Sequence, residues 1–339
     1  MTQPRDPVEA RADDDTDLYE VSTWEVRSVL DHIVASAYSL AISGARLFLV
    51  LLGLVLLVAQ VVLGALYDEV VLVFTLLSVV PALLLAAYLW YADVTTNEPL
   101  YLIAATFVLG ILFAGFAGVV NSLVTSGLES VGLAAGIVGF IVQVVFFFVV
   151  VGPVEEAVKL LAVRLYAFRS RRFDAVIDGA VYGAVAGLGF ATIENAIYIS
   201  GQIEGISDPL NLAATGGAIA VVRALAGPGH VIYSAFAGYY LGLAKFNPDR
   251  AGPIVVKGLL IAALIHAVYN SLSGVVLFLA SEFLGVPWIL AFFGFVIVYV
   301  GLFGLILLRK LGRYRRAYNA AHDDGPDGGP TADLTEFDG

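Results

Sequence analysis

The chain has 339 residues, of which 60% are hydrophobic and only 14% charged, and its net charge is −11. Soluble domains carry about 25% charged residues, so this composition indicates a membrane protein. The absence of cysteine excludes disulfides, thiolate metal sites and a cysteine nucleophile. Because the basic clusters lie beside apolar runs, no nucleic-acid binding is expected.

The chain begins with residues 1–31, a polar segment rich in Asp and Glu that we predict to be a flexible, acidic cytoplasmic tail. Eight apolar runs follow, and a helix needs about 20 such residues to cross a bilayer. We therefore predict an all-α, polytopic transmembrane helix bundle over residues 46–310, in a multi-pass protein of the cell membrane. The expected spans are 46–66, 70–91, 100–120, 133–168, 175–200, 229–245, 254–280 and 287–308.

Three stretches differ from simple spans. The run 133–168 is too long for a simple span, so it must overhang the bilayer or break, and Gly152-Pro153 is the expected position of a break. Residues 212–226 are apolar but short and end at Gly227-Pro228-Gly229, which favours a half-helix or an interfacial segment. The terminal stretch 320–339 is rich in Gly, Pro and Asp and predicts a second acidic, disordered tail.

Lys and Arg in short loops mark the cytoplasmic side of a membrane protein. They follow the fourth, sixth and eighth runs here, at positions 164–172, 245–250 and 309–316. Both tails are then cytoplasmic. If the fourth run is really two spans, the N-terminus lies outside, while the second half of the topology does not change.

Ionisable side chains within the spans form four short motifs. Such residues are costly in lipid and mark functional sites. Counted at about 1.5 Å per residue from the nearest cytoplasmic marker, the motifs lie at depths of about 21 to 30 Å. A shared depth is expected of one site and not of scattered structural residues. The motifs are Glu155-Glu156-x-x-Lys159, Phe190-x-x-x-Glu194-Asn195, Gly229-His230 and His266-x-x-x-Asn270.

Each motif also has a structural interpretation. Glu155 and Lys159 have the i, i+4 spacing of an ion pair, although Lys159 could equally serve Glu156. His266 and Asn270 share a helix face and could form hydrogen bonds between helices. A stripe of small residues every four positions, at Gly179, Gly183 and Gly187, predicts close helix packing and not ligand contact.

The four motifs, in this order on successive helices, resemble those of the PrsW family of intramembrane proteases, which is related to the CAAX prenyl endopeptidase and Abi proteins. The resemblance covers a motif-bearing core of about residues 150–275. It implies hydrolysis of peptide bonds in a membrane-anchored protein, such as an anti-sigma factor or another signalling protein. CAAX and Abi proteins usually have His where Glu194 stands, so the PrsW branch is favoured over enzymes that cut prenylated substrates.

The chemistry of amide hydrolysis assigns roles to these residues. We expect Glu155, with Glu156 as second choice, to act as general base. Glu194, His230 and His266 offer a two-His, one-carboxylate set with an open position, which suits zinc, and no organic cofactor is expected. A metal-free version, with Glu155 and His266 activating water, is also coherent. The expected catalytic residues are Glu155, Glu156, Lys159 and Asn270.

The competing class of function is a proton- or ion-coupled transporter. Buried acids and histidines near the midplane also build proton relays and ion sites. The expected helix breaks at Gly152-Pro153 and Gly227-Pro228-Gly229 fit such a carrier. Inverted repeats are ordinarily present in carriers, and none is evident in this sequence.

Overall fold

A computed structural model describes residues 7–8, 11–13, 15–62, 69–93, 98–133 and 135–323. Over these ranges the ordered elements are helices and no strand is formed, which confirms the all-α prediction. Eight helical segments in this part of the chain are long and apolar enough to cross a membrane. The chain divides into two compact units, Met1–Leu52 and Gly53–Gly339.

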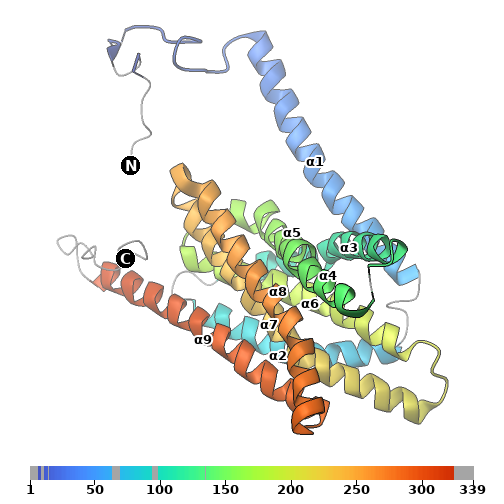
Figure 1. Cartoon of the computed structure of the whole chain (residues 1–339). Coiled ribbons are helices and arrows are strands. Elements are labelled where there is room, and N and C mark those ends of the chain that lie inside the picture. Colours follow the sequence, from blue (N-terminus) through green and yellow to red (C-terminus); the bar gives the residue numbers. More distant parts are fainter. Residues whose placement is uncertain are drawn as a thin grey trace. The chain divides into compact units, whose positions relative to one another are not determined.

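The helices follow one another with short connections (Figure 1). The short α4 and α5 are joined by a π-helical turn, Phe147–Val151, and together form one long membrane-crossing segment. The helices are α1 Val29–Val62, α2 Glu69–Tyr91, α3 Leu100–Ser130, α4 Gly136–Phe146, α5 Gly152–Leu165, α6 Val176–Ile203, α7 Pro209–Lys245, α8 Ala251–Leu284 and α9 Trp288–Asp323.

Helix α1 begins at Val29, well before the predicted span start at residue 46. The side chains just before it explain the early start. Asp31 accepts the backbone N–H of Ser28 at 2.7 Å, and Ser28 Oγ accepts the N–H of Asp31 at 3.1 Å. This reciprocal capping box satisfies N–H groups that the first helical turn would leave without partners.

Helix α6 is the centre of the second unit. Of the residues in its most hydrophobic 18-residue stretch, 94% are buried. Its glycine stripe lies against α7, as predicted. A Cβ atom added at Gly183 or Gly187 would collide with the backbone carbonyl of Ser234 or His230, respectively. The small residues therefore let the two backbones approach closely, and this brings His230 and Ser234 of α7 beside α6.

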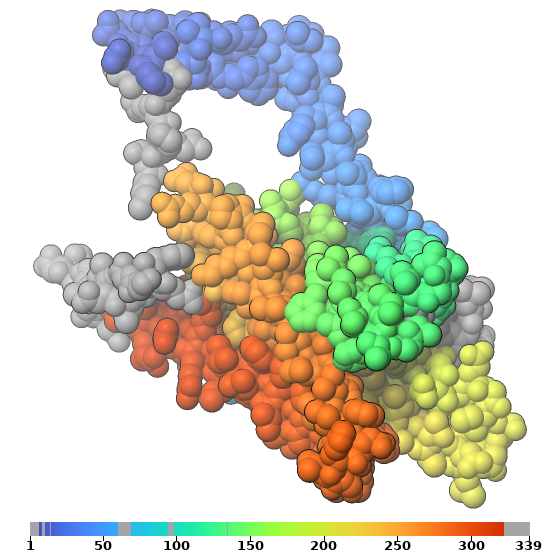
Figure 2. Space-filling view, in the orientation of Figure 1, coloured from blue at the N-terminus to red at the C-terminus, as the bar shows by residue number. Residues whose placement is uncertain are grey.

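Helices α8 and α9 form much of the face of the second unit that Figure 2 shows, in orange and red-orange, with the green α4 beside α8. Both α4 and its π-helical turn pack against α8, while α7 packs against α8 and α9. The motif-bearing helices therefore form one group, in which α5 and α7 contact each other and each contacts both α6 and α8.

The predicted break at Gly152-Pro153 is wrong, because the chain stays helical there; the irregularity is a π-helical turn, Phe147–Val151, just before Gly152. Proline has no N–H to donate, and its ring collides with the carbonyl four residues earlier in a regular α-helix. The wider turn immediately before Gly152 relieves that conflict. Gly152 also lies against the carbonyl of Ala263 in α8, where a Cβ would not fit.

The predicted end at Gly227-Pro228-Gly229 is wrong. Helix α7 runs without interruption from Pro209 to Lys245, so residues 212–226 are its first half and not a separate half-helix. Ending a helix inside a bilayer leaves several backbone N–H and C=O groups without water to bind. A proline within a continuous helix leaves fewer such groups, so the helix continues through it.

Helix α9 continues past the predicted span end at residue 308 and reaches Asp323. Its last turns carry basic and aromatic side chains, and Tyr314 accepts the N–H of Val176 at 3.3 Å. Long basic side chains can place their charges in water while their stems cover apolar surface. Most of the predicted C-terminal tail, residues 324–339, lies outside the described residues, as do residues 1–6 of the predicted N-terminal tail.

Candidate active site

Helix α5 carries three ionisable side chains that are almost completely buried. Glu155, Glu156 and Lys159 are 4%, 0% and 1% exposed. Lys159 Nζ lies 2.7 Å from Glu156 Oε1 and 3.8 Å from Glu155 Oε2, so its stronger partner is the acid three residues earlier. The ammonium also lies 4.1 Å from the centre of the Phe190 ring in α6, a favourable cation–π contact.

Glu156 joins three helices through its carboxylate. Besides Lys159, it accepts a hydrogen bond from Ser234 Oγ of α7 at 3.2 Å and lies 2.9 Å from His266 Nδ1 of α8. A carboxylate on Nδ1 holds that proton in place and leaves His266 Nε2 available to a ligand. Glu156 is therefore a fixed support for its neighbours.

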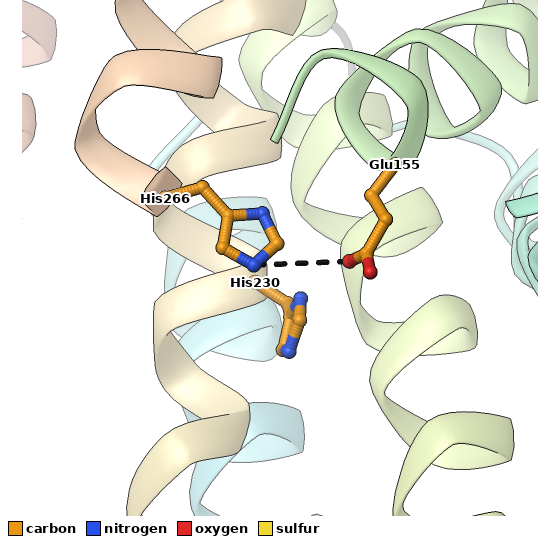
Figure 3. Close-up of side chains that lie close together, drawn as sticks. All are labelled: Glu155, His230 and His266. Atoms are coloured by element: carbon orange, nitrogen blue, oxygen red, sulfur yellow. Dashed lines mark ion pairs between the residues drawn. The ribbon is translucent and has the colours of Figure 1, made fainter. Parts of the chain in front are cut away.

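Glu155 faces the other way, into a cavity of about 520 Å³. Asn121 Nδ2 of α3 donates to Glu155 Oε1 at 3.2 Å, while Glu155 Oε2 has no hydrogen-bond partner. That oxygen lies 3.7 Å from His266 Nε2, the pair joined by the dashed line in Figure 3. One of the two adjacent acids is thus engaged by three side chains, while the other has an oxygen that receives no hydrogen bond and lies within 4 Å of Lys159 and His266.

His230 has contacts at both ring nitrogens. Lys159 Nζ lies 3.0 Å from Nδ1, and Glu194 Oε2 lies 2.8 Å from Nε2. Because the ammonium can only donate, Nδ1 accepts in this arrangement and Nε2 carries the proton that is donated to Glu194. His230 is therefore oriented by a cation on one side and an anion on the other.

Glu194 belongs to a second polar network that the sequence did not suggest. Its carboxylate pairs with Arg223 of α7. Arg223 Nε also donates to Asn195 Oδ1 at 2.8 Å, and Asn195 Nδ2 donates to Ser78 Oγ of α2 at 2.9 Å. Arg223 lies in the stretch interpreted as a short half-helix, and a basic residue there can anchor the helix or pair with an acid; the spacing alone does not select Glu194, 29 residues away.

The predicted site residues converge on one place from four helices. Asn270 and Glu194 line the same cavity as Glu155, His230 and His266. Asn121 also lines this cavity and was missed, because the third span was expected to end at residue 120. Asn121 carries no charge, so it does not stand out among the ionisable residues. A longer third helix, continuing past residue 120, was the signal that could have included it.

Three residues in this cluster could hold a metal ion together: Glu155, His230 and His266 (Figure 3). One ligand atom from each lies within 4.8 Å of the others. A tetrahedral zinc ion with bonds of about 2.1 Å separates its ligands by about 3.4 Å, so small side-chain shifts would complete such a site. This set shares both histidines with the predicted one but has Glu155 in place of Glu194.

Comparisons with known proteins identify the family of the chain. A family described as "PrsW family intramembrane metalloprotease" matches residues 98–302. The Protease PrsW of Bacillus subtilis (strain 168) is 28% identical over 195 residues, which cover 57% of this chain and 79% of that protein. The Protease PrsW of Clostridioides difficile (strain 630) is 30% identical over 197 residues, covering 58% and 76%.

A third relative, the Protease PrsW of Shouchella clausii (strain KSM-K16), is 27% identical over 221 residues, covering 64% of this chain and 92% of that protein. No solved structure gives a significant match. The matched range 98–302 contains all four motifs.

Proposed function

The chain belongs to the PrsW family of intramembrane metalloproteases, and we propose that Glu155, His230 and His266 form the centre at which it cuts its substrate. It is therefore a multi-pass membrane peptidase acting on a membrane-anchored protein within the bilayer. The transporter alternative gains no support from the comparisons, since every relative reported above is named as a protease.

The observation that carries this proposal is that Glu155, a residue of the cavity wall, has a carboxylate oxygen that receives no hydrogen bond. Hydrolysis needs a base within hydrogen-bond reach of a water molecule. Glu155 can offer Oε2, whereas the Glu156 carboxylate already binds Lys159, Ser234 and His266. We therefore assign the general base to Glu155, which takes a proton from water and then delivers it to the leaving amide nitrogen.

A metal ion fits the residues that surround this oxygen. One Glu155 oxygen would bind the ion together with His266 Nε2, which Glu156 leaves free, while the other Glu155 oxygen stays available as the base. His230 would join them by exchanging one of its two present hydrogen bonds. The proposed ion is zinc, which when bound would activate water and polarise the scissile carbonyl.

The neighbouring side chains position these groups. Lys159 and Glu156 hold His266 and His230 in orientation, and Asn121 fixes one Glu155 oxygen. We assign Asn270, in the cavity wall, the role of hydrogen-bond donor to the oxyanion that develops on the substrate carbonyl. We assign Glu194 the role of positioning His230. The alternative, direct binding of the metal by Glu194, is distinguished by the metal content of the Glu194→Ala variant.

The test combines metal content with proteolysis. Full-length protein is purified in detergent, its bound metal is quantified, and it is reconstituted with tagged single-span membrane proteins. We expect about one zinc per chain and a fragment cut within the substrate's membrane span. His266→Ala and Glu155→Gln should each lose both cleavage and the bound metal, because each removes a proposed ligand. The exposed Glu129→Gln at the end of α3 is the matched control.

Two results would change the assignment. If Glu194→Ala loses the metal while Glu155→Gln keeps it, the ligands are Glu194, His230 and His266, as the sequence predicts. Cleavage by a folded, metal-free wild type would favour the metal-free mechanism. For the substrate we propose an anti-sigma factor or another signalling protein, and a tagged anti-sigma factor compared with a tagged unrelated single-span protein addresses this separately.

A further inference from the structure

A second cluster of carboxylates lies at the other end of α6, away from the proteolytic site. Asp93 follows α2, Glu98 precedes α3, and Asp178 lies in the first turn of α6. One oxygen of each lies within 4.8 Å of one oxygen of each of the others. The cluster thus joins three chain segments with oxygen ligands alone.

Glu98 is the member that needs an explanation. It is 2% exposed, and its Oε1 has no hydrogen-bond partner. Its other oxygen accepts the Tyr182 hydroxyl of α6, and its backbone carbonyl accepts Trp90 Nε1 at 3.2 Å. A buried carboxylate oxygen without a donor is unfavourable, and proteins normally satisfy such an atom with a hydrogen bond or an ion.

The donors around this cluster are largely neutral. Asp178 Oδ2 accepts the backbone N–H groups of Asp174 and Ala175 at 2.7 and 2.8 Å. Lys245 is nearby, but its ammonium donates to the carbonyls of Phe168, Ser170 and Phe173 at 2.7 to 3.2 Å. Burial, followed by the charge of Asp178, raises the pKa of the Glu98 carboxyl to about 8. By geometry, Glu98 Oε1 is the acceptor in this cluster that a bound cation would satisfy.

We propose that Asp93, Glu98 and Asp178 bind a divalent cation of the hard, oxygen-binding class, Mg²⁺, Ca²⁺ or Mn²⁺. Three carboxylates without nitrogen or sulfur ligands match the preference of these ions and not that of zinc. The ion ties the segment between α2 and α3 to the start of α6. Since α6 also carries Glu194 and Asn195, occupancy of this site stabilises the helix that supports the proteolytic centre.

The alternative occupant is a proton shared between Glu98 and a neighbouring carboxylate. The two cases respond differently to their surroundings. A cation site makes stability depend on the concentration of the ion by mass action. A shared proton makes stability depend on pH and leaves it indifferent to divalent ions.

The site has a built-in optical probe. Terbium(III) replaces calcium in oxygen sites and emits when a nearby Trp or Tyr is excited, and Trp90 and Tyr182 both contact Glu98. The experiment titrates full-length protein in detergent with Tb³⁺, follows the sensitised emission, and then displaces the ion with Ca²⁺ or Mg²⁺. The Glu155→Gln background removes the contribution of a proteolytic ligand. In parallel, thermal unfolding is measured with EDTA and with millimolar Mg²⁺ or Ca²⁺.

We expect saturable emission and a rise in Tm with divalent ions. Glu98→Gln and Asp93→Asn should each weaken Tb³⁺ binding by at least about tenfold and remove the ion-dependent rise in Tm. Because Glu98→Gln alters a buried residue and could fail to fold, Asp93→Asn tests the same site at a less buried position. Glu204→Gln, an exposed change just after α6, is the control. Unchanged Tb³⁺ affinity in both variants, or a Tm that responds to pH but not to any of the ions, would overturn the proposal.

Discussion

In its described residues the second unit holds two groups of three carboxylates, each side chain at least partly buried, and the groups differ in their surroundings. Glu155, Glu156 and Glu194 lie among built-in cations and imidazoles: Lys159 and Arg223 pair with them, and two histidines contact them. In the second group, Tyr182 and backbone N–H groups are the donors seen at Glu98 and Asp178. The comparison teaches that a protein can supply compensating charge from its own chain, or leave a place for it to come from solution.

The largest effect is expected where the first cluster leaves one oxygen unpartnered. Glu155→Gln keeps the size of the side chain but removes the base, so the rate of substrate cleavage should fall by about 10²- to 10⁴-fold. The measurement is the initial rate of fragment formation in liposomes, with Tm confirming that the variant is folded. A rate within a few-fold of wild type would show that Glu155 is not the base.

The next effect tests whether the first cluster depends on its own cations. Arg223→Leu leaves Glu194 without its guanidinium partner, although His230 remains in contact. Removing one partner of a buried ion pair costs about 3–5 kcal/mol, and the partial exposure of this pair places the expected loss toward the lower end. Unfolding in detergent measures it.

A matched double variant completes that measurement. Replacing both Arg223 and Glu194 by Leu should recover part of the lost stability, because no buried charge is then left alone. If the single and double variants are equally unstable, the pair does not contribute as an ion pair. In that case the stability of the first cluster comes from packing.

A smaller effect is expected from the helix that carries members of both clusters. Gly183 lies between Asp178 and Glu194 on α6, and a Cβ there would meet the Ser234 carbonyl. Gly183→Ala should separate α6 from α7 and lower stability by about 1–3 kcal/mol. Gly201→Ala, in open space near the end of the same helix, is the control. Equal Tm values for the two variants would contradict the close-packing role.

The smallest effect concerns the fine positioning of Glu155. Asn121→Ala removes one hydrogen bond to the carboxylate and should lower kcat by about tenfold, equivalent to about 1.4 kcal/mol. KM should change little, because the bond orients the base and does not bind substrate. Gln143→Ala, in the wall of the same cavity, serves as the comparison. A change confined to KM would instead make Asn121 a substrate-binding residue.

The local pattern of the sequence was sufficient for the membrane class, the helical fold and the motif residues. Apolar runs of about 20 residues dictate spanning helices, because lipid offers no partner for an unpaired backbone group. The glycine stripe at Gly179, Gly183 and Gly187 predicted close packing in the same way. These inferences depend on short-range chemistry that any segment carries with it.

The tertiary structure decided which of two adjacent acids faces the cavity. Glu155 and Glu156 are indistinguishable by composition and spacing, and the positions of His266, Ser234 and Asn121 separate them. It also brought Arg223 to Glu194, and Asp93 and Glu98 to Asp178. These contacts depend on how helices pack across long sequence separations. A carboxylate's role is set by the charges and donors around it, which local sequence does not specify.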